Sequence, residues 1–261
     1  MGKATAVSTV ARGGQALIIS RSQEKLQKAV LEIQKQAAEC CRKGQKLGQV
    51  QTAVLDVTNE DAIRDFVETL PPVSDDDEES NTWDALVFSA AGRAPHGSIT
   101  DLPIADTREL FETKFWGAYN CAKYFGPKLT YGGSIVFVGG VLNRRPGINC
   151  SPLASTNGAL EGLTRALALE FGDRLRVNCL SPGFCETERF DHMDPVKKAQ
   201  MLANTADSLP LKRTGIPQDM GEAIYHLLES KFITGVVLDC DGGHHIRQYA
   251  NRNTDPMRKN D

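Results

Sequence analysis

Three short segments of the sequence carry side chains that could do chemistry. His244-His245 could bind a metal ion, but no third ligand stands at a recognisable spacing, so we interpret them as surface histidines and predict no metal site. Cys150-Ser151 offers a thiol and a hydroxyl, but no histidine or lysine stands at a set spacing to activate them, so we interpret the segment as a loop. Arg144-Arg145 could reach a substrate anion, although a solvated pair is the plainer interpretation.

Composition and charge are those of an ordinary globular chain. Hydrophobic residues make up 41% and charged residues 24% of 261 residues, and the net charge of −3 favours neither nucleic acid nor a membrane as a partner. The 7 cysteines are scattered without a Cys-x-x-Cys pair, which is typical of reduced thiols. With no signal peptide or apolar span in view, we expect a cytoplasmic protein. The acidic run 74–80 predicts a solvated loop, with a docking site for a basic partner as the alternative.

Short apolar segments alternate with segments of helical periodicity along the chain. We expect helices at residues 23–39, 59–70 and 153–171, and another running through Phe111 and Ala122. Strands are expected at residues 16–20, 50–55, 85–89, 133–138, 175–180 and 235–240. Strands linked by helices of this length form a parallel sheet covered on both faces. We therefore predict a single α/β domain over residues 1–261, with an irregular tail at 246–261.

Five short motifs occur along the chain in a fixed order. They are Leu55-Asp56-Val57, Ser89-Ala90-Ala91-Gly92, residues 176–183 ending in Pro182-Gly183, Thr187, and residues 239–243. Taken singly, each has a plainer interpretation, such as a helix cap for Asp56, a turn for Pro182-Gly183 or a surface hydroxyl for Thr187. Together they resemble the short-chain dehydrogenase/reductase family over nearly the whole chain.

The resemblance implies both a fold and a binding site. The fold is a Rossmann-like, doubly wound parallel sheet in three α/β/α layers. The implied dinucleotide site places Asp56-Val57 against the adenine and Thr187 against the nicotinamide carboxamide. The implied site also includes Ala90, Ala91 and Gly92, which stand where the family has its Asn-Asn-Ala-Gly turn, and the turn Pro182-Gly183.

The sequence departs from the family first at the glycine-rich turn. In the family, strand one leads into Thr-Gly-x-x-x-Gly-x-Gly, whose glycines let the backbone approach the pyrophosphate at a helix N-terminus. Gly2 matches the last glycine, and the strand and the earlier glycines have no counterpart. That strand belongs between residues 16–20 and 85–89, so we predict a gap or distortion of the sheet there. We interpret this as a truncated sequence or a gene whose first exon is missing, with a genuinely strand-deleted protein as the alternative.

The second departure concerns the catalytic residues that the resemblance implies. The family's tyrosine and lysine positions hold Leu153 and Asn157, the serine position holds Gly140, and the asparagine of the preceding helix corresponds to Lys114. Leu153 cannot protonate a carbonyl oxygen because it has no titratable group. Lys114 and Asn157 look exchanged, so we predict an ammonium and an amide that face each other in the cleft. Drift after loss of catalysis is the alternative.

The end of the strand at 16–20 bears on cofactor preference. Ser20-Arg21 stands where an acidic residue would accept hydrogen bonds from the ribose 2′-hydroxyl of NAD. A guanidinium pairs with phosphate through two parallel hydrogen bonds, so this pair favours NADP over NAD. Arg21 as a solvated residue at a helix start is the alternative. The incomplete glycine-rich turn predicts impaired cofactor binding.

Three functions fit these residues. The leading hypothesis is an NADP(H)-dependent carbonyl/alcohol oxidoreductase with altered acid–base residues, Lys114 and Asn157, and an unknown small-molecule substrate. The second is a non-catalytic dinucleotide-binding or dimer-partner protein, and the third is a non-redox isomerase or cyclase that uses the same pocket. The family resemblance also implies a homo-oligomer.

Overall fold

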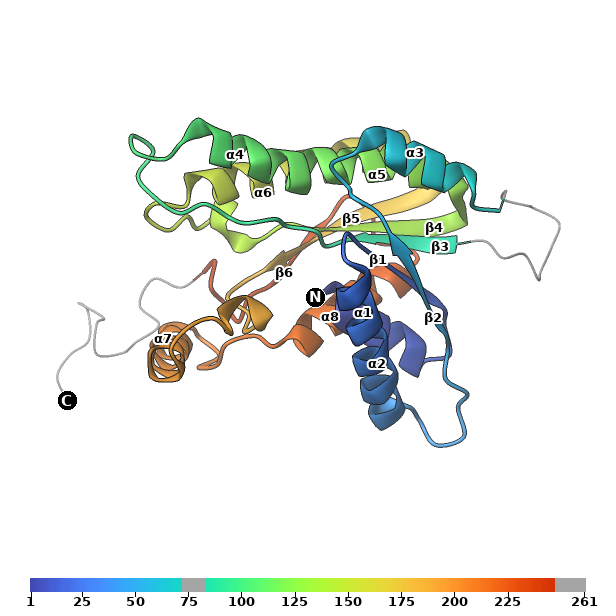
Figure 1. The fold of residues 1–261 in the computed structure, drawn as a ribbon, viewed down its shortest axis with the longest axis horizontal. Coiled ribbons are helices and arrows are strands. Elements are labelled where there is room, and N and C mark those ends of the chain that lie inside the picture. The colour runs from blue at the N-terminus through green and yellow to red at the C-terminus, as the bar shows by residue number, and fades with distance from the viewer. Residues whose placement is uncertain (72–82, 247–261) are drawn as a thin grey trace.

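The computed structural model describes residues 1–71 and 83–246. The acidic run 74–80, predicted as a loop, lies outside the described residues, as does the predicted tail beyond Ile246. The described part is one α/β unit in which helices lie on both sides of parallel strands (Figure 1).

The described strands form two separate parallel sheets (Figure 1). The larger sheet has the order β3-β4-β5-β6, with every neighbouring pair parallel. Its strands are β3 (Trp83–Phe88), β4 (Leu129–Val138), β5 (Leu175–Pro182) and β6 (Val237–Cys240). The smaller sheet pairs β1 (Ala16–Ser20) in parallel with β2 (Val50–Val54). The six strands fall where the sequence predicts strands, to within a few residues at each end.

The two sheets are separated between β1 and β3. Among the described strands, β1 pairs only with β2, and β3 pairs only with β4. Each of the two strands therefore has one edge without a strand partner, and these edges bound the same gap. The sequence prediction of a gap between residues 16–20 and 85–89 is confirmed.

The helices form two layers, one on each side of the strands (Figure 1). One layer consists of α3 (Glu60–Glu68), α4 (Ile104–Phe111), α5 (Gly117–Phe125) and α6 (Ser151–Glu170). The other layer consists of α1 (Gly2–Ala11), α2 (Gln23–Cys40) and α8 (Pro217–Glu229). The helix α7 (Pro195–Ser208) lies to the side of both. No helix in the described ranges is long and apolar enough to serve as a membrane span.

Burial and capping explain why these segments adopt these structures. All eight residues of β5 are buried, as expected of a strand covered by helices on both faces. Ser22 begins α2 by accepting a hydrogen bond from the Lys25 amide, and Asn59 begins α3 by accepting one from the Ala62 amide. One apolar cluster packs the larger sheet against α3, α5 and α6, and a second packs it against α8, so both faces of this sheet are covered.

The helix predicted through Phe111 and Ala122 is interrupted. A π-helical turn at Glu112–Trp116 joins α4 to α5. Such turns are rare and occur frequently at functional sites. Lys114 lies in the middle of this turn, and its side chain is buried.

Candidate functional site

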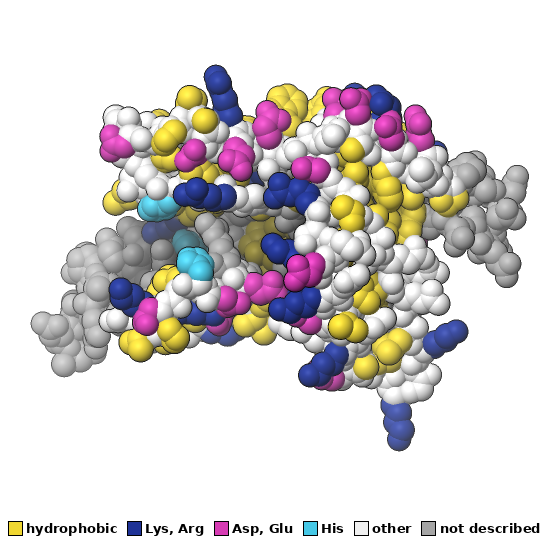
Figure 2. Space-filling model, in the orientation of Figure 1, with side chains coloured by type: hydrophobic (Ala, Val, Ile, Leu, Met, Phe, Trp, Pro, Cys, Tyr) yellow, Lys and Arg dark blue, Asp and Glu magenta, His cyan; other side chains and the backbone are white. Residues whose placement is uncertain are grey.

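A large cavity opens at the carboxyl ends of the strands. Its volume is about 2280 Å³, and Figure 2 shows the hollow with Lys, Arg and His side chains at its edge. Residues that follow β1, β3, β4 and β5 line it, together with the start of α1. The cavity also extends between β1 and β3, whose residues line it along their whole length. In open α/β sheets this edge is where ligands bind.

Lys114 and Asn157 meet at the bottom of this cavity. Lys114 is 3% exposed and Asn157 is 1% exposed, and both line the cavity. The Lys114 ammonium donates to Asn157 Oδ1 at 2.5 Å and to the Gly139 carbonyl oxygen at 3.1 Å. The predicted contact between the two side chains is therefore present, with α6 supplying Asn157 and the π-helical turn supplying Lys114.

The Asn157 side chain packs directly against the backbone of Gly140. A Cβ atom placed on Gly140 would lie 2.8 Å from Asn157 Nδ2 and 3.4 Å from its Cγ. Gly140 also has φ of 154°, which favours glycine. The Asn157 amide thus occupies space beside Gly140 that a side chain at that position would need. Leu153 lines the same cavity and offers only apolar surface.

Most of the expected dinucleotide residues lie around the cavity. Gly2 begins α1, and a Cβ atom there would lie 2.5 Å from Ser89 Oγ. No side chain caps the N-terminus of this helix, so its first amides lack an intrahelical partner, and Gly2, Lys3 and Ala4 line the cavity. The other lining residues among those predicted are Ser20, Val57, Ala90, Ala91, Gly92, Pro182, Gly183 and Thr187.

Arg21 and Asp56 lie outside this lining. Arg21 is exposed, and its Nη1 lies 4.0 Å from Asp56 Oδ2. Asp56 Oδ1 accepts hydrogen bonds from the Thr58 amide and hydroxyl, and these bonds, the amide's above all, hold the pKa of Asp56 below its usual range. In this arrangement Asp56 closes the turn before α3, which is the plainer interpretation of that residue.

Lys3 is a charged residue of the site that sequence reasoning missed. Its ammonium contacts the carboxylates of Glu32 on α2 and Glu188 beyond Thr187. Burial lowers the pKa of Lys3, but its hydrogen bonds to Glu188 and Glu32 outweigh burial and raise the pKa above the ordinary value. The signal available in the sequence was its position directly after Gly2, at the start of the helix that faces the cavity.

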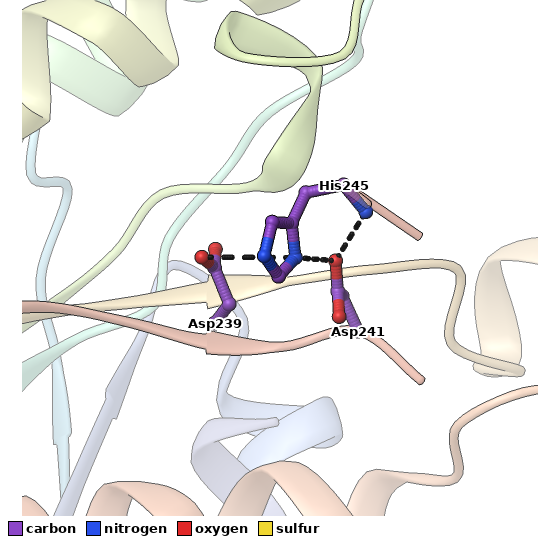
Figure 3. Close-up of side chains that lie close together, drawn as sticks. All are labelled: Asp239, Asp241 and His245. Atoms are coloured by element: carbon purple, nitrogen blue, oxygen red, sulfur yellow. Dashed lines mark hydrogen bonds and ion pairs between the residues drawn. The ribbon is translucent and has the colours of Figure 1, made fainter. Parts of the chain in front are cut away.

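The histidine pair after β6 has acidic neighbours that the sequence did not reveal. His245 Nδ1 lies 2.7 Å from Asp241 Oδ2 and 3.8 Å from Asp239 Oδ2 (Figure 3). Asp241 also accepts hydrogen bonds from the amides of Gly243 and His245. Asp239 forms an ion pair with Arg144, whose Nη2 donates a hydrogen bond to Asp239 Oδ1 at 2.5 Å. The cluster is therefore an internally bonded turn, and the arginine occupies a carboxylate that a metal would require.

Arg144 joins three elements. Besides Asp239 on β6, it lies 3.3 Å from Glu161 Oε1 on α6. Its own position is at the end of the 3₁₀ turn Val141–Asn143 that follows β4. This confirms neither the solvated interpretation nor a substrate contact, because the guanidinium is occupied by two carboxylates.

The fold and the cavity at the carboxyl ends of the strands are those of an α/β protein of the Rossmann type. A family model described as enoyl-(acyl carrier protein) reductase matches residues 1–245. The uncharacterized oxidoreductase YxbG of Bacillus subtilis is 25% identical over 251 residues, which cover 93% of this chain and 86% of that protein. Galactitol 2-dehydrogenase (L-tagatose-forming) of Cereibacter sphaeroides is 29% identical over 256 residues, which cover 93% and 95% of the two chains.

A solved structure indicates the same family as the sequence relatives. A small-chain dehydrogenase crystallised in complex with NADPH is 27% identical and superposes with a TM-score of 0.70, covering 89% of this chain and 99% of its own. The chain belongs to the short-chain dehydrogenase/reductase family of NAD(P)-dependent oxidoreductases. The family resemblance seen in the sequence is confirmed.

The residues around the cavity fit a nicotinamide dinucleotide. The uncapped N-terminus of α1 offers amide donors for a pyrophosphate. Lys3 lies beside it, with its ammonium paired to Glu32 and Glu188. Ser20 at the end of β1 and Thr187 after β5 both line the cavity. Bound there, the cofactor would supply or accept a hydride.

Proposed function

We propose that this protein is an NADP(H)-dependent carbonyl/alcohol oxidoreductase that uses Lys114 and Asn157 as its acid–base and carbonyl-binding residues. The observation that carries the proposal is the buried hydrogen bond between these two side chains at the bottom of the cavity. Removing polar groups from water costs free energy unless they are paired, and these two side chains pair with each other where both line the cavity.

Lys114 is the proton carrier in this proposal. It is the titratable side chain among the four positions at which the family places its catalytic residues. In carbonyl reduction its ammonium gives a proton to the oxygen while the carbon receives the hydride, and in alcohol oxidation the neutral amine takes the proton back. Proton transfer of this kind requires the Lys114 side chain to pass between its charged and its neutral form during turnover.

Asn157 holds the carbonyl oxygen. Its Oδ1 accepts from the Lys114 ammonium, which directs Nδ2 toward Gly140. Within the described residues Nδ2 has no protein acceptor, so its N–H groups remain available to a ligand in the cavity. Nδ2 lies beside the glycine that stands in the family's serine position, and we assign it the serine's task of donating to the substrate oxygen.

Arg21 selects NADP over NAD in this proposal. The guanidinium is 67% exposed and its pair with Asp56 is loose, at 4.0 Å. Exposed pairs of this kind contribute only about 0–1 kcal/mol, so a 2′-phosphate can take the arginine at little cost. The NADPH found in the related dehydrogenase agrees with this preference. NADPH should therefore bind more tightly than NADH.

We also propose that the gap between β1 and β3 is the place of one further parallel strand. Both strands present an edge without a strand partner to it, and unpaired buried amides and carbonyls are costly. The gap is apolar on both faces, with Phe66 and Phe125 on one side and Ala4 and Ala6 on the other. In the chain of residues 1–261, backbone amides of β1 and β3 should exchange rapidly with deuterium and cofactor binding should be weak.

A matched comparison tests this part of the proposal. Extending the N-terminus by an apolar strand and a glycine-rich turn should slow amide exchange in β1 and β3 and tighten NADPH binding. An extension of the same length made of Gly and Ser is the control. Slow exchange in both strands without any extension would mean that the edges are already paired, and the proposed strand position would be wrong.

The oxidoreductase proposal is tested by turnover. The extended chain is assayed with NADPH against a panel of ketones and quinones, and NADPH binding is measured separately by titration. Oxidation of NADPH that depends on a carbonyl compound supports the proposal. Cofactor binding without turnover favours a non-catalytic binding protein, which Leu153 in the tyrosine position also favours. Conversion of a substrate without net NADPH oxidation favours an isomerase or cyclase.

We propose further that the chain forms a homo-oligomer through the outer face of α5 and the π-helical turn. Trp116 and Tyr119 are both substantially exposed there, and the centroids of their rings lie 5.9 Å apart in an edge-to-face arrangement. Large aromatic side chains are enriched at protein interfaces. Sedimentation analysis should show a dimer or tetramer, and Trp116→Glu should shift it toward the monomer. If the Trp116→Glu variant sediments with the same oligomeric mass as the parent, the assignment of this face is wrong.

A further inference from the structure

The substrate end of the cavity carries more basic than acidic side chains, in a protein whose net charge is negative. The net charge of the chain is −3. At the carboxyl ends of β3–β6, however, basic and imidazole side chains outnumber the acidic ones that line the cavity. They are Arg93, His96, Lys114, His192 and His244, and the carboxylate lining this end in the described residues is Glu188. Figure 2 shows Lys, Arg and His side chains around the hollow, with Asp and Glu side chains on its lower rim.

The carboxylates that line the cavity are engaged elsewhere. They are Glu32, Asp84 and Glu188 among the described residues. Glu32 and Glu188 both contact Lys3, and Asp84 accepts a hydrogen bond from Thr130 at the amino end of β3. They therefore do not neutralise the basic groups at the substrate end.

Arg93 is the residue best placed to bind an anion. It follows the turn Ala90-Ala91-Gly92, is exposed, and lines the cavity. It forms no ion pair or hydrogen bond with any residue in 1–71 or 83–246, whereas Arg144 and Arg213 each contact a carboxylate. An arginine without a partner presents a planar donor surface that matches a carboxylate or phosphate.

The remaining wall is apolar. Leu142, Leu153, Phe184 and Phe190 line the cavity beside the basic groups. The rings of Phe184 and Phe190 stack at 5.3 Å with an interplanar angle of 14°, forming a flat surface. A ligand that contacts both the basic groups and the apolar wall at this end of the cavity needs a negative charge and an apolar body.

We propose that the substrate is an amphiphilic anion, namely a carbonyl compound with an apolar body and a carboxylate or equivalent anionic group that Arg93 binds. This names the substrate class of the proposed oxidoreductase site and rests on that function for the carbonyl group. The anionic group is not altered in the reaction. It fixes the apolar body against Phe184 and Phe190 so that the carbonyl reaches Asn157 and Lys114.

The experiment measures binding without cofactor or turnover, so that it can succeed or fail independently of the oxidoreductase proposal. The probes are 4-phenylbutanoate and 4-phenylbutanamide, which share one body and differ in charge, titrated by calorimetry into the full chain. Arg93→Gln is compared with Arg108→Gln, which removes the same charge from an exposed residue of α4 that does not line the cavity. Thermal unfolding confirms that both variants fold.

The carboxylate should bind the parent about tenfold more tightly than the amide, which is the effect of one charge-assisted contact of about 1.4 kcal/mol. Arg93→Gln should reduce this preference to about twofold or less and leave the affinity for the amide unchanged. Arg108→Gln should behave like the parent. Equal affinities for the two probes, an equal loss in both variants, or no binding of either probe at millimolar concentration would overturn the proposal.

Discussion

The contact between Lys114 and Asn157 should appear as a coupling free energy in a double-mutant cycle. The variants are Lys114→Met, Asn157→Leu and the combination of the two, with the free energy of unfolding measured for each. Met and Leu keep much of the buried volume, so the cycle isolates the polar contact. Stability is measured without substrate or cofactor, and the result does not depend on any assumed reaction.

The expected magnitude follows from burial and geometry. The ammonium donates to Asn157 Oδ1 at 2.5 Å with both side chains at most 3% exposed. A hydrogen bond to a charged group contributes about 1.5–3 kcal/mol. Asn157→Leu should cost more than Lys114→Met, because it takes an acceptor away from a buried charge. The double variant should lose the contact only once, so its destabilisation should fall short of the sum by about 1.5–3 kcal/mol.

Denaturation in urea, followed by fluorescence and circular dichroism, measures the four free energies. A control cycle uses Lys123→Met and Glu60→Gln, whose side chains lie 2.8 Å apart on the surface. An exposed pair of this kind should couple by about 0.2–1 kcal/mol. Additive effects of the Lys114 and Asn157 substitutions, within about 0.5 kcal/mol, would refute the contact.

Other substitutions test separate parts of the structure. Arg21→Asp should reverse the order of affinity so that NADH binds more tightly than NADPH, and fluorescence titrations giving equal affinities in the parent would remove the role of Arg21. Gly183→Ala should destabilise the fold by about 1–3 kcal/mol, because its Cβ would lie 2.6 Å from the Asp241 Cα, and unchanged thermal unfolding would contradict that packing. Burial raises the pKa of Asp241, but hydrogen bonds from His245 and Gly243 outweigh burial and lower it, so its contribution to stability is present above about pH 4 and lost as the pH falls through the lowered pKa. Asp241→Asn should therefore flatten the dependence of stability on pH below about pH 4, and parallel curves for the two proteins would contradict this.

The fold was predictable because its strands are short apolar runs between periodic helices. All six strands and the gap between β1 and β3 follow from that pattern and from the family resemblance. The helix α7 was not predicted, and none of its residues is buried, so it lacks the apolar periodicity on which such a prediction depends. The π-helical turn was also invisible in the sequence, because one extra residue in a helical turn leaves no compositional signal.

The site was predictable where position along one strand or helix decides it. The contact between Lys114 and Asn157 was predictable because each residue occupies a fixed place in its own helical segment. Lys3 was missed because its partner Glu188 lies far away in the sequence. His245 meets Asp241 because Gly242 and Gly243 adopt positive φ and turn the chain back, and the sequence does not specify that path.

Comparison of Lys114→Met with Lys123→Met under turnover tests the central claim most directly. The extended chain is assayed with NADPH and the carbonyl compound that the parent reduces best, and NADPH affinity is measured alongside. Lys114→Met should lower kcat/KM by about 10²-fold or more while NADPH still binds, because proton transfer by a positioned side chain contributes at least about that factor. Lys123→Met removes an exposed ammonium on α5 and should leave turnover unchanged. Equal turnover in Lys114→Met and the parent would contradict the assignment of Lys114 as the proton carrier.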